Sequence, residues 1–88
     1  MYWGVTSTVT VAKGKSGSRT ANFPTSFFSN VYYASVCMDR YNATMANSGG
    51  VWTWLGSVST TQIVGEAYVT SEASASKTFR FKFLAIGI

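Results

Sequence analysis

Residues 78 to 88 have the sequence TFRFKFLAIGI, and this stretch decides the fold class. Side chains at alternate positions of a β-strand point to the same face of the sheet. One face would carry Phe79, Phe81, Phe83 and Ala85. The other face would begin with charged residues and end with aliphatic ones, in the order Arg80, Lys82, Leu84, Ile86 and Ile88. The alternation therefore predicts a strand from Thr78 to Gly87 whose second face becomes apolar toward its end.

Five more segments have the valine, threonine and aromatic content that favours strands, and polar or glycine-containing runs separate them. They are Trp3–Lys13, Arg19–Phe23, Asn30–Arg40, Val51–Val58 and Gln62–Thr70. In the first segment, Trp3, Val5, Val9 and Val11 are expected on one face, and Thr6, Thr8 and Thr10 on the other. We predict an all-β fold without helices, a small antiparallel β-sandwich of about six strands.

The length of 88 residues allows one domain, and such a short chain buries a small core. Val31–Met38 and Val51–Leu55 are apolar on both predicted faces, as is the end of the last strand. A small sandwich normally leaves one face of each sheet in water. We therefore expect another chain to cover these faces, although a tightly wrapped monomer would also bury them.

The residue types that are missing argue against an enzyme. The chain has no histidine, one cysteine and three acidic residues, Asp39, Glu66 and Glu72. Histidine-dependent nucleophiles, thiolate zinc sites and an internal disulfide are therefore excluded, and we expect no metal and no cofactor. Cys37 stands between Val36 and Met38 and is expected to be a small buried side chain. No apolar run reaches the roughly 18 residues that a membrane span requires, so we expect no membrane insertion.

If the strands run alternately up and down, the loops fall alternately at the two ends of the sandwich. The segments Lys13–Arg19, Arg40–Gly50 and Ser71–Lys77 then share the end opposite the chain's entry. Five of the seven basic residues lie in or beside them, which predicts a positive field that attracts anionic surfaces. The candidate ligand-binding residues at this end are Lys13, Lys15, Arg19, Arg40, Tyr41, Asn42, Asn47, Trp52 and Lys77. The alternative is that these are ordinary solvated loop residues.

The aromatic and polar members of this set suit sugars. Tyr41 can stack on the apolar side of a pyranose, and Asn42 and Asn47 can bond hydroxyls. Trp52 is either a stacking residue or part of the core. Trp54 is expected in the core, and Trp3 is expected to be structural.

Three landmarks occur in order along nearly the whole chain: Trp3-Gly4, then Phe23-Pro24-Thr25-Ser26-Phe27, then Phe83-Leu84-Ala85-Ile86-Gly87-Ile88. In these landmarks the chain resembles the C-terminal, receptor-binding tip domain of bacteriophage tail fibres. The resemblance implies a homotrimer at the distal tip of a fibre in the virion, preceded by a fibre shaft. It also implies contact with the bacterial surface. Residues 1–88 would then be one tip domain, a fragment of a longer fibre protein.

The function predicted from these observations is non-enzymatic recognition of a bacterial surface saccharide, such as lipopolysaccharide, through the end loops. One alternative is a structural trimerisation cap that binds no receptor. A second is a single-stranded nucleic-acid binder with an OB-like fold, suggested by a pI near 9.5 and the aromatic content. Arg80 and Lys82 lie opposite the phenylalanines of their strand, which is typical of a half-buried strand with a solvated edge. We therefore expect no nucleic-acid partner.

Overall fold

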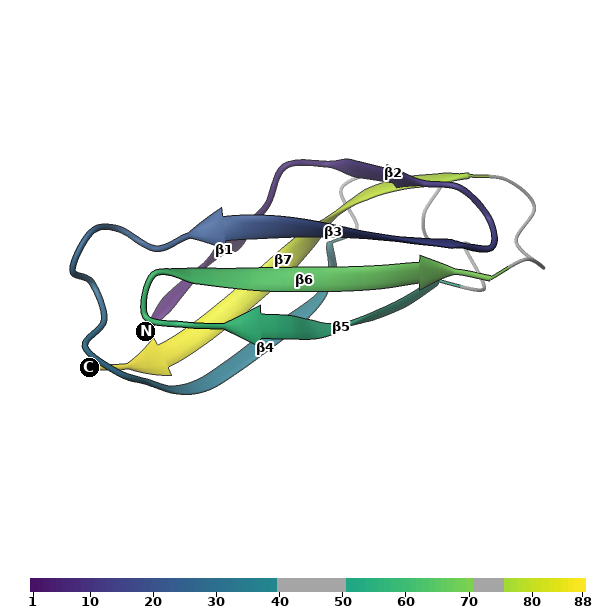
Figure 1. The fold of residues 1–88 in the computed structure, drawn as a ribbon. Helices are drawn as coiled ribbons and strands as arrows, with labels where there is room; N and C mark the ends of the chain where they lie inside the picture. Colours follow the sequence, from purple (N-terminus) through teal and green to yellow (C-terminus); the bar gives the residue numbers. More distant parts are fainter. Residues whose placement is uncertain (40–50, 71–75) are drawn as a thin grey trace.

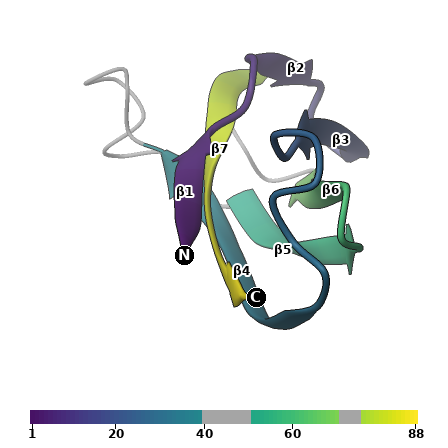
Figure 2. The same cartoon turned by 90° about the vertical axis from the view of Figure 1, so that its left-hand side faces the viewer.

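The computed structural model describes residues 1–39, 51–70 and 76–88 of the chain. Within these ranges it contains no helix and seven strands: β1 (Tyr2–Val5), β2 (Val9–Val11), β3 (Lys15–Asn22), β4 (Val31–Asp39), β5 (Val51–Val58), β6 (Gln62–Val69) and β7 (Lys77–Gly87). The strands form two antiparallel sheets that face each other in a sandwich-like arrangement (Figures 1 and 2). The prediction of an all-β, antiparallel fold is confirmed.

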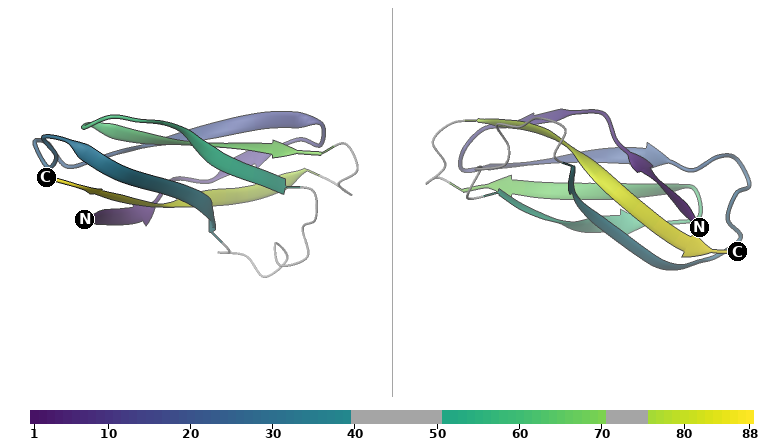
Figure 3. Two further views of the ribbon diagram at one scale, coloured as in Figure 1. Left: turned by 90° about the horizontal axis from the view of Figure 1, so that it is seen from below. Right: turned by 180° about the vertical axis from the view of Figure 1, so that it is seen from behind.

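The last strand, β7, lies at the centre of the first sheet. β1 and then β2 follow one side of β7, and β4 pairs along its other side. The view from behind in Figure 3 shows β7 crossing the molecule from end to end. The expectation that Arg80 and Lys82 lie on a solvated edge is therefore wrong, because β7 has neighbours on both sides.

The second sheet has the order β3–β6–β5, with β6 in the middle. β5 and β6 form a hairpin, and β3 pairs with β6 over its whole length, from Lys15 opposite Val69 to Asn22 opposite Gln62. Along the two sides of the sandwich, β2 lies against β3 and β4 against β5. The two sheets thus enclose one narrow interior (Figure 2).

The segment predicted as a single first strand is divided in two. Val5 pairs with Lys82 and Val9 with Phe79, so four residues along the first segment correspond to three along β7. The odd difference reverses the alternation, and Trp3 and Val5 point outward whereas Val9 and Val11 are buried. Thr6 closes the break: its N–H donates to the Phe81 carbonyl at 2.9 Å, and its Oγ1 accepts from the Phe81 N–H at 3.1 Å. The prediction that Trp3, Val5, Val9 and Val11 share a face is wrong.

The third strand begins earlier than predicted. The turn that precedes it is closed by the Lys15 N–H, which donates to the Ala12 carbonyl at 3.1 Å, and Gly14 has a φ of 77° there. Gly17, expected in the loop, lies within β3 instead. A Cβ on Gly17 would come 2.8 Å from the Val11 side chain, so this glycine permits a close approach of β2 and β3.

The core forms two adjoining clusters, and β7 contributes to both. Toward the start of β7, Phe79 and Phe81 pack with Val9, Val11, Ala67 and Val69. Toward its end, Phe83 and Ala85 pack with Phe23, Phe28 and Ile63. The predicted inward face of the last strand is therefore confirmed, since all four of its residues are buried.

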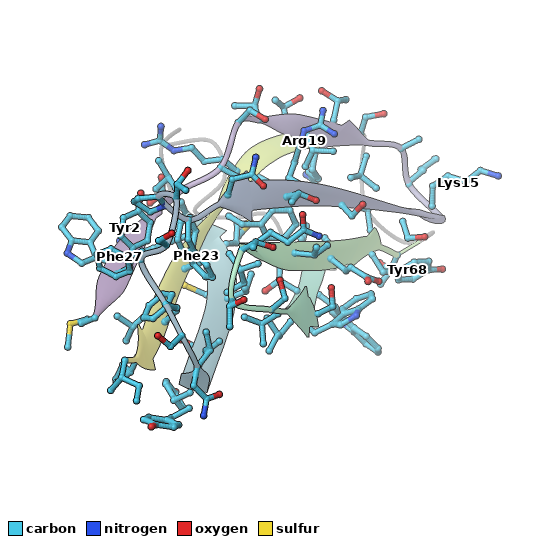
Figure 4. The ribbon with its side chains drawn as sticks, turned by 60° about the vertical axis from the view of Figure 1, so that its left-hand side comes forward. Tyr2, Lys15, Arg19, Phe23, Phe27 and Tyr68 are labelled. Carbon is cyan, nitrogen blue, oxygen red and sulfur yellow. The ribbon has the colours of Figure 1, made fainter. Side chains whose placement is uncertain are left out.

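Aromatic rings gather at the end of the sandwich where both termini lie. Tyr2 meets Phe23 and Phe27 in edge-to-face contacts, with ring centroids 5.7 and 5.3 Å apart, and its side chain is labelled beside theirs in Figure 4. Phe28 in turn contacts Phe23 at 4.9 Å. The Phe23–Phe27 landmark thus connects the two sheets at this end.

Candidate functional site

Three predicted lysines lie at the end of the sandwich opposite the termini. Lys13 and Lys15 are exposed in and beside the turn between β2 and β3, and the Gly14 N–H holds this turn to β6 by donating to the Val69 carbonyl at 2.6 Å. Lys77, half-buried, begins β7 opposite Val11. Figure 4 shows Lys15 extending beyond the sheet, far from Tyr2 and Phe27. We call this region the distal end.

Four of the predicted site residues, Arg40, Tyr41, Asn42 and Asn47, lie outside the described residues. The described residues that flank them are at the distal end. Asp39 pairs with Arg80 near the start of β7, and Val51 pairs with Val69 at the end of β6. All described strands that lead into residues 40–50 and 71–75 reach the distal end. They therefore agree with the prediction that these segments share one end.

Arg19 occupies a different place from the lysines. It lies in the middle of β3 opposite Gly65, and its guanidinium donates to the Thr8 carbonyl at 2.9 Å and to the Ser18 carbonyl at 3.1 Å. The bond to Thr8 connects β3 to the link between β1 and β2. Arg19 thus lies away from the distal end, beside a backbone carbonyl that it satisfies.

Asp39, at the end of β4, is already paired. Its carboxylate accepts from Arg80 Nε at 2.5 Å and lies 3.8 Å from Lys82 Nζ. This ion pair is partly buried, and it keeps the Asp39 charge beside β7. Among the described residues, the positive charge of Lys13 and Lys15 at the distal end is therefore not paired with a carboxylate.

Trp52 lies on the outer face of the β3–β6–β5 sheet with 66% of its surface exposed. Tyr68 stands directly opposite it on β6, and Ser16 is opposite Tyr68 on β3. One step along the sheet, Trp54 stands opposite Glu66, with 41% of its surface exposed. The expectation that Trp54 belongs to the core is wrong. Phenylalanines of β7 fill the interior, and the inward positions of β5 and β6 hold smaller residues such as Val51, Leu55, Gly65 and Ala67.

Tyr68 and Glu66 were not among the predicted site residues. Their signal was present in the alternation of Gln62–Val69, where Ile63, Gly65, Ala67 and Val69 are buried and the residues between them point outward. Large or polar side chains at the positions between small apolar ones indicate an outer face, and Trp52 on the neighbouring strand extends that face.

The outer face of the first sheet lies on the other side of the molecule; it is apolar toward the end with the termini and carries Lys82, Arg80 and Asp39 toward the distal end. It carries Trp3, 69% exposed, together with Val5, Tyr33, Leu84 and Ile86. A hollow of about 220 Å³ lies on this face among Trp3, Ser35, Cys37, Lys82, Phe83 and Leu84. Cys37 is exposed, so the prediction of a buried thiol is wrong. It occupies an outward position of β4 opposite Lys82.

A second hollow, of about 490 Å³, lies at the end with the termini. Its lining comes from the segment around Pro24 and from the β5–β6 turn, and it includes Asn22, Phe23, Thr25, Ser26, Phe28, Thr60 and Thr61. None of the predicted site residues lines it.

No protein-family model, curated protein or solved structure matches this chain. Within residues 1–39, 51–70 and 76–88, no three side chains of histidine, cysteine, aspartate or glutamate gather as metal ligands would. The same residues contain no helix of the length and apolarity needed to cross a membrane. Any functional assignment therefore depends on the chemistry of the surfaces described above.

Proposed function

We propose that this chain is a non-enzymatic recognition domain, the tip of a bacteriophage tail fibre that attaches to polysaccharide on the bacterial surface. The observation that carries the proposal is the distribution of charge. Lys13, Lys15 and Lys77 lie at the end opposite both termini, where the strands flanking residues 40–50 and 71–75 also end. A shaft joined at the terminal end would leave the distal end facing outward from the virion.

Cationic side chains at this end suit the anionic groups of bacterial polysaccharides, including the phosphates of lipopolysaccharide. Opposite charges accelerate encounter between partners, and salt weakens the effect. A single sugar site is typically weak, and several linked copies bind far more strongly by avidity. The distal end therefore fits attachment by an oligomer better than tight binding by one chain.

The oligomer in this proposal is a homotrimer that buries the apolar part of the outer face of the first sheet. This face presents Trp3, Val5, Leu84 and Ile86 to water in the single chain, which is the apolar character of a contact between subunits. The number of copies is inferred from the resemblance to fibre tips. The position of the contact is inferred from the exposed apolar residues.

The same apolar face favours a second candidate function, a structural cap that holds the end of a fibre in register. The cap would assemble in the same way, but its distal end would bind no receptor. Cell attachment separates the two functions, whereas oligomeric state does not.

The proposal is tested with the purified chain on paired bacterial strains that have or lack their surface polysaccharide. We expect particles of three times 9.5 kDa by light scattering, and retention only on strains that carry the polysaccharide. Assembly without attachment to any strain would favour the cap. Equal retention on both members of every pair would contradict polysaccharide recognition.

A further inference from the structure

The outer face of the β3–β6–β5 sheet combines exposed aromatic rings with small hydroxyl groups. Its residues stand in two adjacent cross-strand rows: Ser16–Tyr68–Trp52 and Ser18–Glu66–Trp54. Residues directly opposite each other in a sheet have Cβ atoms about 4.5–5.5 Å apart. Two indoles, a phenol, a carboxylate and two hydroxyls are thus all within reach of one short ligand.

The charge on this face argues against an anionic ligand. Among the described residues at outward positions of the three strands, the only charged side chain is Glu66. Arg19 is occupied by the Thr8 carbonyl, and Lys15 extends past the end of the sheet (Figure 4). A nucleic-acid backbone would meet a carboxylate without the basic side chains that normally track phosphates.

The Glu66 carboxylate can accept hydrogen bonds from a ligand. Glu66 forms no ion pair with any described residue, and its carboxylate lies over Gly56, where a side chain would collide with it. Ligand hydroxyls are suitable donors to such a carboxylate, and the Ser16 and Ser18 hydroxyls can donate or accept.

The two outer faces of the molecule differ in the partners that they suit. The first sheet exposes Trp3 beside Val5, Leu84 and Ile86, as at contacts between subunits, and its charged residues Arg80, Lys82 and Asp39 lie farther along the same face. The second exposes flat rings among hydroxyls and one carboxylate, a mixture that leaves polar groups unsatisfied against an apolar partner. Flat rings matched to the apolar side of a pyranose, with polar groups beside them, suit a sugar.

We propose that this face, defined by Trp52, Tyr68, Trp54 and Glu66, binds neutral hexose units of a polysaccharide. The sugar stacks on Trp52 and Tyr68, and Glu66 accepts its hydroxyl protons in hydrogen bonds. The inference deepens the proposed function: the lysines of the distal end attract the anionic groups of a chain, and the adjoining sheet face binds its uncharged units. Only the bacterial origin of the sugar rests on that proposed function.

The test is an NMR titration of the full chain with short oligosaccharides of glucose, galactose and N-acetylglucosamine. We expect at least one sugar to shift the resonances of the Trp52 and Trp54 indoles. Trp52→Ala and Tyr68→Ala should each weaken binding about ten-fold, equivalent to about 1.4 kcal/mol. Trp52→Phe, which keeps a flat ring, should retain more affinity than Trp52→Ala.

Trp3→Ala is the matched control, because Trp3 and Trp52 are almost equally exposed on opposite sheets. It should leave sugar affinity per chain unchanged. The proposal would be overturned if no sugar shifted these indoles, if Trp52→Ala bound normally, or if a single-stranded oligonucleotide displaced every sugar. Dissociation of the oligomer by Trp52→Ala would also overturn it, because a second copy would then cover the face. Failure of cell attachment with intact sugar binding would count against the tail-fibre assignment alone.

Discussion

At the scale of single residues, Thr6 holds the first sheet together where β1 passes into β2. Its buried hydroxyl accepts from the Phe81 N–H and donates to the Ser7 carbonyl at 2.8 Å. Thr6→Val preserves the shape but leaves the amide of a fully buried residue without this acceptor. We expect the free energy of unfolding to fall by about 1–3 kcal/mol, measured by urea denaturation at fixed protein concentration.

Thr10→Val is the control for that substitution. The Thr10 hydroxyl also bonds another chain segment, Thr78 at 2.8 Å, but it does so in solvent. Its loss should change stability by no more than about 0.5 kcal/mol. Equal losses of stability in the two valine variants would show that the buried Thr6 bond contributes no more to the free energy of unfolding than an exposed bond.

Gly65 is a residue at which the two sheets approach closely. A Cβ at this position would come 2.8 Å from both the Phe81 ring and Val36 Cγ1. Gly65→Ala should therefore overpack the interior and lower stability by about 1–3 kcal/mol in the same denaturation assay. Gly56→Ala is the comparison, because there the nearest atoms belong to the flexible side chain of Glu66. A Gly65 variant as stable as the Gly56 variant would refute the tight contact.

At the scale of elements, the sequence predicted the later strands better than the earlier ones. The predicted segments from Asn30, Val51, Gln62 and Thr78 differ from β4, β5, β6 and β7 by at most one residue at each end that the structure describes. These strands have clear alternation and polar separators. The break between β1 and β2 could not be seen, because Val5 and Val9 keep an even spacing in sequence and only the pairing with β7 makes it odd.

The same limit explains why the sequence could not show whether Trp52 and Trp54 point inward or outward. Alternation put Trp52 and Trp54 on one face of a strand but could not show which face turned inward. That choice depends on volume across the interior, where the phenylalanines of β7 require small partners on β6. An indole facing them would not fit, so the rings lie outside.

The outer face of β7 is where we expect copies of the chain to contact one another. Ile86 is 38% exposed on that face, beside Trp3 and Leu84. If the proposed oligomer forms, Ile86→Lys should convert it to monomers or weaken its association at least about ten-fold, because it places a charge in the proposed apolar contact. Sedimentation over a range of concentrations would measure this change.

Val58→Lys provides the control for Ile86→Lys, since Val58 is 37% exposed but lies at the end of β5 in the other sheet. It should leave the association unchanged. Weakening by Val58→Lys alone would place the contact between copies on the second sheet.

At the scale of the whole molecule, the two ends and the two outer faces have distinct chemistry. Aromatic packing joins the sheets where the termini lie, and the lysines gather at the opposite end. The sequence allowed this polarity to be predicted, because alternating strand direction depends only on the number of strands. The division of β1 from β2 preserved it, since both run in the same direction along β7.

The effect of the distal-end charge on cell attachment can be measured separately from the effect of the net charge of +4. Lys13→Ala with Lys15→Ala removes two positive charges there, and we expect attachment to polysaccharide-bearing cells to fall about ten-fold or more at low salt. The wild-type and variant curves should converge as salt is added, because screening removes the advantage of the lysines. Thr25→Glu with Thr60→Glu lowers the net charge equally at the terminal end, where both threonines are exposed. If that control lost attachment to the same extent, net charge and not the distal end would govern binding.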